Sequence, residues 1–387
     1  MIVKIKDVCS AVYSGGTPNK KHPEYYDGGE IPWLNTGEIE FNRIYKTEKY
    51  ISDIGFNSSS AKWVPANAVI VAMYGATAAR TAITKIPLTT NQACCNLIID
   101  DAKADYRYVY YYLCSQYTQL ASLANGGAQQ NLNAGQVKDF DIDLPDMATQ
   151  RKVADLLTML DDKIEVNNEI NKNLLAQAQA IFTEEFLSID HIPDGWTESS
   201  LLGIADYLNG LAMQKFRPSG DEHGLPVLKI KELRQGSCDA NSELCSPSIK
   251  PEYIVRDGDV IFSWSGSLLV DFWCGGTCGL NQHLFKVTSN DYDKWFYFAW
   301  TNHHLQKFVA IAADMATTMG HIKREELTKA KVLIPLQSDY DRIGGLLAPL
   351  YDLVIANRIE NRKLASLRDE LLPQLMSGQL DVSEVSL

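Results

Sequence analysis

The longest regular pattern of apolar and polar positions runs from Thr149 to about Leu187, a stretch without proline or glycine. Apolar or amide residues recur there at alternating intervals of four and three, which is the spacing of a coiled-coil seam. The same phase returns near the C-terminal end of the chain. The pattern predicts two long helices, with seams formed by Val153, Leu157, Leu160, Ile164, Asn167, Asn171, Leu174, Ala178 and Ile181, and by Ile343, Leu347, Leu350, Val354, Asn357, Asn361 and Leu364.

Outside these stretches, the pattern predicts mixed structure rich in strands. Short apolar runs bounded by Gly, Pro, Asn or Asp favour strands. Amphipathic spacing predicts helices over Tyr106 to Ala124 and Lys294 to Ala312. The predicted class is therefore α+β, with strands at Ala68–Tyr74, Asn96–Ile99, Asp259–Ser263 and Lys331–Pro335.

The chain repeats itself at a separation of about 190 residues. Ile31-Pro32-Trp33-Leu34 returns as Leu225-Pro226-Val227-Leu228, and the run from Val64 to Ala82 is echoed from Val255 to Phe272. Asn91-Gln92 recurs as Asn281-Gln282. A tandem repeat of half-molecules predicts pseudo-two-fold symmetry, which suits a two-fold partner such as duplex DNA or a pair of identical subunits.

The predicted helices carry paired amides at equivalent seam positions. Asn167 and Asn171 match Asn357 and Asn361, and hydrogen bonds between such amides would fix the register of the seam. A helix of this length spans on the order of 58 Å, so an antiparallel pair could separate two binding blocks along a duplex whose turn is ~34 Å. Alternatively, the helices could simply dimerise the protein or close a bundle.

The second helix contains residues that disfavour helical structure. Gly344 and Gly345 are poor helix formers, and Pro349 lacks an N–H and clashes with the carbonyl four residues earlier. We therefore expect a kink around residues 345–349.

The net charge of −12 first argues against a nucleic-acid partner. Residues 1–148 and 197–338, however, each carry a charge of only −2, whereas residues 149–196 carry −5 and residues 339–387 carry −3. Most of the acidic excess therefore belongs to the two predicted helical segments, and the two larger blocks could still present a basic face.

Several classes of chemistry lack their motifs in this sequence. Nucleotide-phosphate loops, the Asn-Pro-Pro-aromatic signature of amino-methyltransferases and a convincing nuclease cluster are all missing. Of the eight cysteines, Cys274 and Cys278 alone have a spacing seen in zinc sites, without a second pair, so reduced and mostly buried thiols are the simpler interpretation. No membrane span or secretion signal is apparent, and we expect a cytoplasmic protein without catalytic residues or a metal site.

Several segments resemble a known family, the specificity subunits of type I restriction-modification enzymes. Ser14-Gly15-Gly16-Thr17-Pro18, followed by Gly28 to Trp33, resembles the opening of many members. Further similar segments lie at Ala72 to Thr77, Thr90 to Gln92, Gln177 to Phe182 and Ile192 to Trp196. The most specific is Leu371 to Gly378, which resembles the end of the family's last helix.

The resemblance covers essentially the whole chain and implies a non-catalytic subunit of a phage-defence system. It implies two pseudo-symmetric mixed α/β target-recognition domains, separated by two long antiparallel coiled-coil helices. Each domain would read one half of a bipartite, asymmetric site in double-stranded DNA. The helices would act as a spacer and bind two modification (methyltransferase) subunits. S-adenosylmethionine, ATP and magnesium would act on partner subunits, including a restriction subunit that translocates and cleaves DNA. The implied divisions are residues 1–148, 149–196, 197–338 and 339–387.

The sequence departs from the family where Glu-Gln often follows the proline that opens each helix. Thr149-Gln150 follows Pro145, and Asp339-Tyr340 follows Pro335. This difference and Pro349 leave open how well the second methyltransferase contact is preserved.

Candidate DNA-reading residues are amides, cations and small hydroxyls on the expected loops, because these groups recognise base edges and phosphates. In the first block they are Thr17, Asn19, Lys20, Lys21, Tyr74, Thr77, Arg80, Gln129, Gln130 and Asn131. In the second block they are Gln214, Lys215, Arg217, Ser263, Ser265, Ser267, Thr317, Thr318, His321 and Lys323. Each of these residues could instead simply lie in a solvated loop.

Asn91-Gln92 and Asn281-Gln282 are interpreted differently. Since both copies share them, they suit a scaffold hydrogen bond or a common backbone contact better than the reading of different bases. Two alternatives to DNA recognition remain: a coiled-coil adaptor whose blocks bind proteins, and an enzyme with unrecognised motifs.

Overall fold

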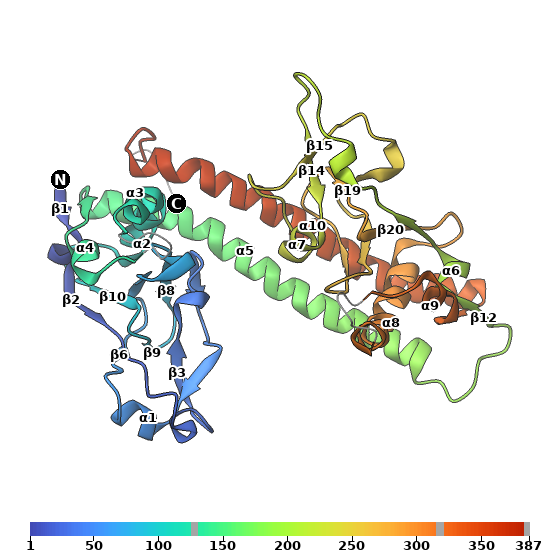
Figure 1. The fold of residues 1–387 in the computed structure, drawn as a ribbon, viewed down its shortest axis with the longest axis horizontal. Coiled ribbons are helices and arrows are strands. Elements are labelled where there is room, and N and C mark those ends of the chain that lie inside the picture. Colours follow the sequence, from blue (N-terminus) through green and yellow to red (C-terminus); the bar gives the residue numbers. More distant parts are fainter. Residues whose placement is uncertain (125–130, 315–320, 383–387) are drawn as a thin grey trace. The chain divides into compact units, whose positions relative to one another are not determined.

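The computed structural model describes residues 1–124, 131–314 and 321–382. The chain divides into two compact units. Unit 1 comprises residues 1–162 and 366–387, and unit 2 comprises residues 163–365. Both long helices are therefore divided between the units instead of belonging to one (Figure 1).

The described residues of unit 1 form one five-stranded sheet, one four-stranded sheet and a two-stranded ribbon. Their strand orders are β2-β10-β7-β8-β4, β5-β3-β9-β6 and β1-β11. The strands are β1 (Ile2–Lys4), β2 (Cys9–Ser14), β3 (Ile31–Leu34), β4 (Asn42–Ile44), β5 (Lys49–Ile51), β6 (Trp63–Val64), β7 (Val69–Ala72), β8 (Thr81–Thr84), β9 (Leu88–Thr90), β10 (Cys94–Ile99) and β11 (Asp141–Asp143).

In unit 2, the residues that the structure describes form two four-stranded sheets and a two-stranded ribbon. Their strand orders are β13-β20-β17-β18, β15-β14-β19-β16 and β12-β21. The strands are β12 (Thr197–Ser200), β13 (Asp206–Asn209), β14 (Leu225–Leu228), β15 (Leu244–Cys245), β16 (Ile254–Val255), β17 (Val260–Ser263), β18 (Leu269–Phe272), β19 (Cys278–Leu280), β20 (Leu284–Thr288) and β21 (Lys331–Ile334).

The two units share one topology, which confirms the internal repeat. When β2, β10, β7 and β8 are matched with β13, β20, β17 and β18, the strand order agrees. The second sheets agree as well, including one parallel pair in each, β3 with β9 and β14 with β19. Strand β4, which pairs with β8, has no counterpart among the described residues of unit 2.

The two shorter helices that the sequence pattern predicted are present, although the first is divided. The predicted helix over 106–124 is observed as α2 (Tyr106–Ser115) and α3 (Tyr117–Ser122), and the second as α8 (Lys294–Asp314). Asp105 caps α2 by accepting a 2.8 Å hydrogen bond from the Arg107 N–H. The others are α1 (Asp53–Asn57), α4 (Ala134–Lys138), α6 (Leu201–Ile204), α7 (Ile230–Gln235) and α9 (Arg324–Lys329).

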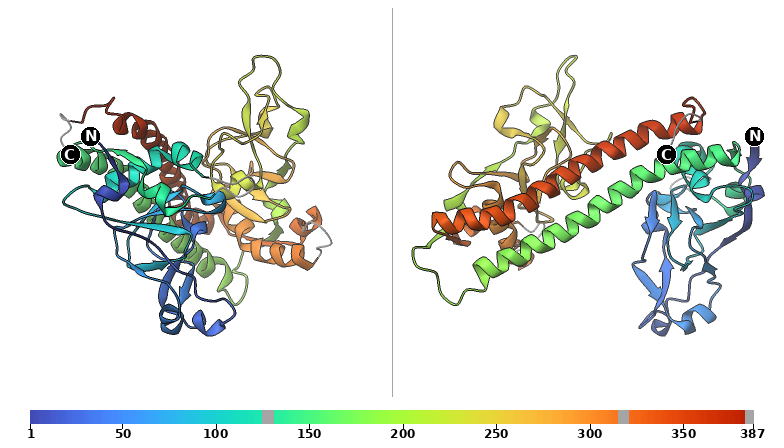
Figure 2. Two further views of the ribbon diagram at one scale, coloured as in Figure 1. Left: turned by 60° about the vertical axis from the view of Figure 1, so that its left-hand side comes forward. Right: turned by 180° about the vertical axis from the view of Figure 1, so that it is seen from behind.

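The two long helices are α5 (Met147–Phe182) and α10 (Gln337–Met376). A single π-helical turn, Thr183–Leu187, extends α5, so the predicted end at about Leu187 is correct. Within each unit the segments of α5 and α10 lie side by side and run in opposite directions (Figure 2). Every predicted seam residue is buried or half-buried.

Helix α10 is continuous through Gly344, Gly345 and Pro349. The kink expected around residues 345–349 stays a prediction, because a continuous helix can bend at a proline. Gly344 has a packing role, because a Cβ there would lie 2.9 Å from the indole Nε1 of Trp295. A Cβ on Gly345 would meet no atom within 4 Å, and this open surface gives the Pro349 ring room over the preceding turn.

Each unit has its own hydrophobic core. In unit 1 the largest cluster joins the inner face of β7 and β10 to α2 and the first turns of α5, with Val71, Leu97, Val109 and Leu157 among its members. In unit 2 the corresponding cluster is strongly aromatic, and it packs α8 against β17, β18 and α10. The buried helix faces therefore anchor each sheet and fix the direction of its loops.

Candidate nucleic-acid interface

In unit 1, the predicted loops leave one edge of the main sheet. Strand β10 pairs antiparallel with both β2 and β7, with Cys95 opposite Ser14 and Cys94 opposite Ala72. The ends of β2 and β7 are therefore level with the start of β10. The segment that begins at Asn131 joins these strand ends, because the Leu132 N–H donates to the Met73 carbonyl at 2.8 Å.

Unit 2 repeats this arrangement. Asn209, at the end of β13, lies opposite Phe285, and Ser263, at the end of β17, lies opposite Leu284. The Ile322 N–H donates to the Trp264 carbonyl at 3.1 Å, which matches the Leu132 bond of unit 1. Three loops thus gather at one sheet edge in each unit.

Glycine is required where the first loop turns away from each sheet. A Cβ on Gly15 would lie 2.0 Å from the Thr90 carbonyl oxygen, and one on Gly210 would lie 2.4 Å from that of Leu280. Next to these glycines, the Gly16 N–H donates to Thr90 at 2.9 Å and the Leu211 N–H donates to Leu280 at 2.9 Å. The matching close contacts fix the departure of the first loop in both copies.

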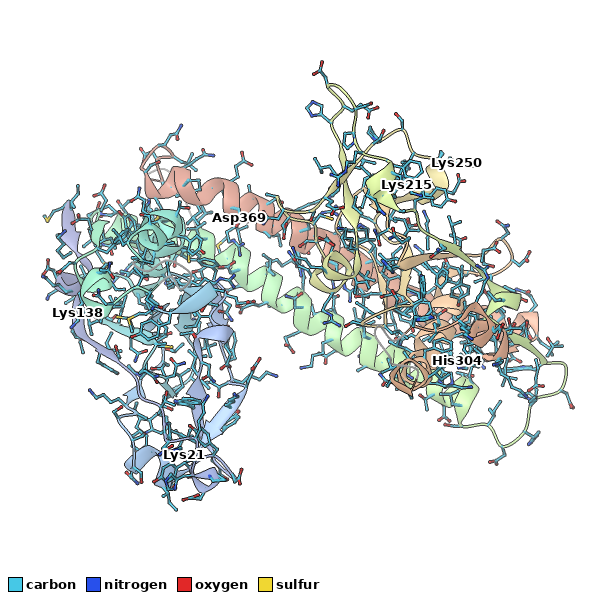
Figure 3. All side chains as sticks on the ribbon, viewed as in Figure 1. Lys21, Lys138, Lys215, Lys250, His304 and Asp369 are labelled. Carbon is cyan, nitrogen blue, oxygen red and sulfur yellow. The ribbon has the colours of Figure 1, made fainter. Side chains whose placement is uncertain are left out.

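The first loop of unit 1 presents cations to solvent. Asn19, Lys20 and Lys21 are exposed, and the Asn19 Oδ1 accepts a 3.0 Å hydrogen bond from the Lys21 N–H. Thr17 is only half-exposed, and its hydroxyl donates to the Gln92 Oε1. Neither lysine forms an ion pair within the ranges that the structure describes. In Figure 3, Lys21 lies beside α1 of unit 1.

The second turn of unit 1 combines an exposed aromatic ring with an engaged cation. Tyr74 is 44% exposed and pairs with Asn131, itself exposed, through an isolated antiparallel bridge. The Thr77 hydroxyl donates to the Tyr74 carbonyl at 3.4 Å. Arg80 forms a 3.1 Å ion pair with Glu40, so a phosphate would compete with a carboxylate for its guanidinium.

The first loop of unit 2 is also exposed. Gln214, Lys215 and Arg217 are all exposed, and Phe216 between them leaves 39% of its surface open. Lys215 lies on the side of unit 2 that carries β14 and β15 (Figure 3). The pairing of cations with an open aromatic ring suits phosphate contacts and base stacking.

Two serines of unit 2 do not fit the role predicted for them. Ser263 is fully buried, and its hydroxyl donates to the Ser265 carbonyl at 3.2 Å. Ser265 is 5% exposed, and its hydroxyl lies 3.1 Å from the His283 Nδ1. Both hydroxyls are used inside the fold, because Ser263 is the last residue of β17 and Ser265 pairs with His321 through an isolated bridge. Ser267 is half-exposed, and His321 and Lys323 are exposed.

An aromatic and imidazole cluster in unit 2 was missed by the sequence reasoning. Trp264 contacts the rings of His283 and His321, with ring centres 6.2 Å away in each case. Its Nε1 donates to the Asn209 Oδ1 at 3.1 Å, and Ser265 pairs with His321 through an isolated bridge. The only sequence signal was a tryptophan within a small-residue turn. Four candidates, Gln129, Gln130, Thr317 and Thr318, lie outside the described residues.

The repeated Asn-Gln pairs serve the scaffold. The Asn91 Oδ1 accepts a 3.0 Å hydrogen bond from the Ala93 N–H, and the Asn281 Oδ1 accepts one of 3.2 Å from the His283 N–H. The backbone N–H groups of the two asparagines donate to Leu34 and Leu228, which are equivalent positions at the ends of β3 and β14. This geometry fits the interpretation as scaffold bonds.

The structure brings the seam amides of unit 2 together. Asn167 Nδ2 donates to Asn361 Oδ1 at 2.8 Å, and Asn357 Nδ2 donates to Asn171 Oδ1 at 2.9 Å. Asn167 is 1% exposed. Because the pairings advance along one helix and retreat along the other, they belong to an antiparallel seam.

One further residue near the start of each long helix binds the first residues of a shorter helix in the same unit. Gln150 is buried, and its Oε1 accepts a 3.0 Å hydrogen bond from the Asp105 N–H at the start of α2. In unit 2 the Tyr340 hydroxyl accepts one of 2.7 Å from the Asp293 N–H at the start of α8. Gln150 and Tyr340 thus perform one task with different side chains.

Arginines of α10 hold the loops of unit 2. Arg362 forms a bidentate pair with Asp257 at 2.7 Å, which lowers the pKa of that carboxyl group, and Arg358 pairs with Asp271 at 2.6 Å. These pairs engage two cations of α10 with carboxylates of unit 2, so a phosphate would have to compete with those carboxylates.

All eight cysteines are free thiols in the structure. Burial raises the pKa of Cys274 to about 11 and that of Cys9 to about 12. Cys274 and Cys278 contact different groups: the Cys278 Sγ lies 3.6 Å from the Cys238 Sγ, and the Cys274 Sγ lies 3.9 Å from the Ile355 carbonyl oxygen. Within the described ranges, no group of three or more His, Cys, Asp or Glu residues is arranged to hold a metal ion. No described helix is long and apolar enough to cross a membrane.

Comparisons with known proteins agree with this architecture. The chain matches the family described as "Type I restriction modification DNA specificity domain" over residues 1–176 and 193–367, once for each half of the repeat. The chain belongs to this family.

Individual relatives are distant in sequence. The specificity subunit of the type I restriction enzyme MjaIX from Methanocaldococcus jannaschii is 26% identical, over 99% of this chain and 94% of the relative. That of HindI from Haemophilus influenzae is 17% identical, over 69% and 74%. The crystal structure of a type I restriction-modification S subunit from M. genitalium aligns with a TM-score of 0.59 at 15% identity, over 97% of this chain and 95% of that one, and so shares the fold.

Proposed function

We propose that the chain is the DNA-specificity subunit of a type I restriction-modification complex, and that each unit reads one half of a bipartite, asymmetric site in double-stranded DNA. One observation carries this proposal. The two units share their strand order and the sheet edge from which three loops leave, but differ in the residues on those loops. A common scaffold with different loops suits the reading of two different half-sites.

The loop residues support this division of labour. Tyr74 and Asn131 of unit 1 occupy the places of Ser265 and His321 in unit 2, where Trp264 adds an aromatic ring. Exposed lysines stand on the first loop of each unit. Cations fix a protein on the phosphate backbone, whereas amides and rings on adjoining loops can distinguish bases.

The remaining assignments follow from family membership. We propose recognition domains at 1–148 and 197–338, and helical regions at 149–196 and 339–387 that act as a spacer and bind two modification subunits. The chain itself would be non-catalytic and act in the cytoplasm, where its DNA lies. S-adenosylmethionine, ATP and magnesium would act on the modification and restriction subunits. The comparisons give the alternative of a protein-binding adaptor no support.

Selection from random DNA duplexes tests the proposal. The chain, purified with its modification subunit, should enrich a split consensus with two different halves. Replacing the exposed first loop of unit 1, residues 17–21, should alter one half of the consensus and leave the other half unchanged. Replacing Gln214 to Arg217 should do the reverse. Enrichment of no sequence, or loss of both halves from either replacement, would contradict the proposal.

A further inference from the structure

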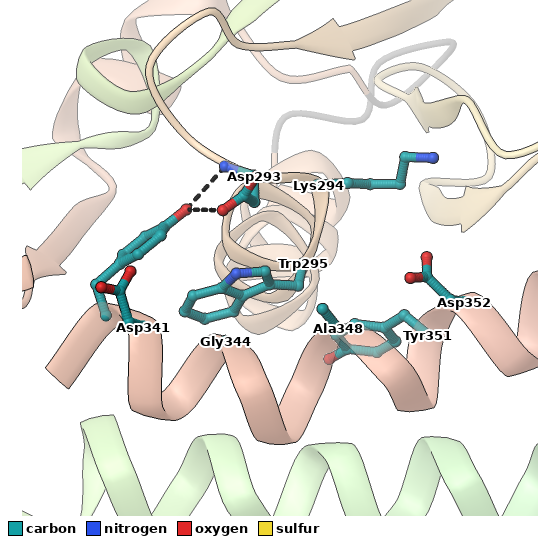
Figure 4. A pocket seen from close by; sticks show the side chains of 9 residues that line it. Asp293, Lys294, Trp295, Asp341, Gly344, Ala348, Tyr351 and Asp352 are labelled. Carbon is teal, nitrogen blue, oxygen red and sulfur yellow. Dashed lines mark hydrogen bonds between the residues drawn. The ribbon is translucent and has the colours of Figure 1, made fainter. Parts of the chain in front are cut away.

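A cleft of about 390 Å³ lies between the start of α8 and the first half of α10 in unit 2. Its floor is aromatic, and Trp295, Tyr340 and Tyr351 are each less than 10% exposed. Three carboxylates, those of Asp293, Asp341 and Asp352, stand around it (Figure 4). An aromatic floor with an acidic rim is suited to a cationic group.

The lining of the cleft carries three carboxylates and one cation. Within the described residues, none of Asp293, Asp341 and Asp352 forms an ion pair; Asp341 accepts a 2.7 Å hydrogen bond from Gln337, and Asp293 one of 3.3 Å from Tyr340. Lys294 is the one cation in the lining, and its Nζ reaches towards Gly258, where a Cβ on that glycine would lie 3.1 Å from it. Three negative charges therefore face one positive charge.

The equivalent place in unit 1 is occupied by arginines of the chain itself. Asp162, 190 residues before Asp352, pairs with the Arg43 guanidinium, whose second nitrogen lies 3.5 Å from the Thr158 carbonyl. Thr158 is the counterpart of Ala348 in the cleft. Arg43 leaves only 6% of its side chain exposed. In unit 1, this face of α5 therefore binds a guanidinium group.

A second arginine completes the contrast. Arg107, two residues after Asp105, pairs with that aspartate at 2.8 Å and with Asp155 of α5 at 2.5 Å. In unit 2, Trp295 stands two residues after the equivalent Asp293 and packs on Gly344 instead. The strand that carries Arg43, β4, has no counterpart in the described part of unit 2. Unit 2 therefore keeps the counterparts of Asp105 and Asp162, namely Asp293 and Asp352, without the two arginines, whereas the counterpart of Asp155 is Gly345.

Two polar groups on nearly buried side chains of the cleft also lack partners. The Trp295 Nε1 and the Tyr351 hydroxyl form no hydrogen bond with any described residue, although these residues are only 3% and 6% exposed. Both side chains line the cleft. Neither atom belongs to the fully buried polar atoms without a partner, so water can reach both, and a bound polar group could take the place of that water.

We propose that this cleft receives an arginine side chain from a modification subunit, at a contact that the first half of the repeat makes internally. The inference rests on the proposed function, which supplies the partner. Arginine suits the site better than lysine, because its planar guanidinium can stack on an aromatic ring while pairing with carboxylates. It follows that the two modification subunits are bound unequally, and that only one of them contributes an arginine here.

Native mass spectrometry of the full chain with its modification subunit tests the proposal. The variant Asp341→Asn/Asp352→Asn keeps the shape of the cleft and removes two charges. It should weaken the binding of one modification subunit by about tenfold or more and leave the other unchanged. The matched control, Asp27→Asn/Asp221→Asn, removes two exposed charges elsewhere and should bind both copies as the wild type does. Undiminished binding of both copies to the cleft variant would overturn the inference.

A second measurement separates this inference from the proposed function. If the wild-type chain binds no modification subunit, the proposed function fails, and the cleft is then judged with acetyl-arginine amide as the probe. The indole N–H signal of Trp295, assigned with Trp295→Phe, should shift saturably with this probe and not with acetyl-citrulline amide, which lacks the charge. An unchanged signal, or equal shifts with both compounds, would overturn the arginine site.

Discussion

Asn357 donates a 2.9 Å hydrogen bond through Nδ2 to the Oδ1 of Asn171, and so joins α10 to α5 inside unit 2. Both residues are at least 90% buried, and the Nδ2 of Asn171 has no hydrogen-bond partner among the described residues. A buried amide pair contributes little net stability, but a slipped register would leave both amides unpaired. We infer that this pair selects the register of the seam.

A double-mutant cycle on this pair should show strong coupling. Asn171→Leu alone leaves the Asn357 amide buried without its acceptor, and we expect the free energy of unfolding to fall by about 1–3 kcal/mol. Asn171→Leu/Asn357→Leu should recover most of that decrease, since two apolar side chains can pack across the seam. Urea unfolding followed by tryptophan fluorescence measures both effects.

The control for this cycle is Asn173→Leu, at an exposed position of the same helix, which we expect to change stability by less than about 0.5 kcal/mol. Additive effects of the two buried substitutions would show that the amides do not act as a pair.

Adjacent glycines of α10 should respond in opposite directions to alanine. Gly345→Ala should stabilise the protein by about 0.5–1 kcal/mol, because the new methyl group meets nothing and the helix loses a flexible residue. Gly344→Ala should destabilise it by about 1–3 kcal/mol, because the methyl group would enter the buried indole of Trp295. Thermal unfolding of the two variants provides the comparison, and equal shifts would show that Trp295 moves aside freely.

The sequence predicted the helices well because their signal is local and periodic. The seam positions from Val153 to Leu364 repeat at fixed spacing, and the structure buries or half-buries every one. Helix α10 continues through Gly344 and Pro349 although both residues disfavour helical structure, because tertiary packing can override local propensity. The repeat correctly indicated two domains of one topology, although the pairing of distant strands such as β3 with β9 cannot be seen in periodicity.

The site was harder to predict, because exposure depends on how strands end. Ser263 stands one residue before Trp264, yet the serine is buried and the tryptophan lies in the loop cluster. No local rule separates the two. The pairing of Arg43 with Asp162 was equally hidden, because it joins positions 119 residues apart. The exposure of Lys20 and Lys21 could be predicted from the sequence, because charged residues after a glycine turn are rarely buried.

Removing the first-loop lysines should reduce the salt dependence of DNA binding. In the complex with its modification subunit, Lys20→Ala/Lys21→Ala should lower the slope of log K against log salt by about 0.9 for each phosphate that the lysines neutralise. The change should be similar on specific and random duplexes, because phosphate contacts do not distinguish sequence. Fluorescence anisotropy over a salt series measures the slope. The control Lys103→Ala, which removes an exposed lysine paired with Asp100, should leave the slope unchanged. An unchanged slope for Lys20→Ala/Lys21→Ala would show that these two lysines do not contact the DNA.

Acidification should destabilise unit 2 through a buried histidine. His304 is 8% exposed, its Nε2 lies 2.8 Å from the Lys331 carbonyl, and burial lowers its pKa. Because an unfolded histidine titrates near pH 6.5, the unfolded state takes up a proton before the folded state as the pH falls below that value. The free energy of unfolding should therefore drop by up to about 1.4 kcal/mol per pH unit until the folded-state pKa is reached. His304→Gln keeps a donor for the Lys331 carbonyl but cannot titrate, so its free energy of unfolding should depend less on pH between pH 7.5 and 5. The control His191→Gln, at an exposed position, should show the same pH dependence as the wild type. A wild-type slope in His304→Gln would assign the pH dependence to other groups.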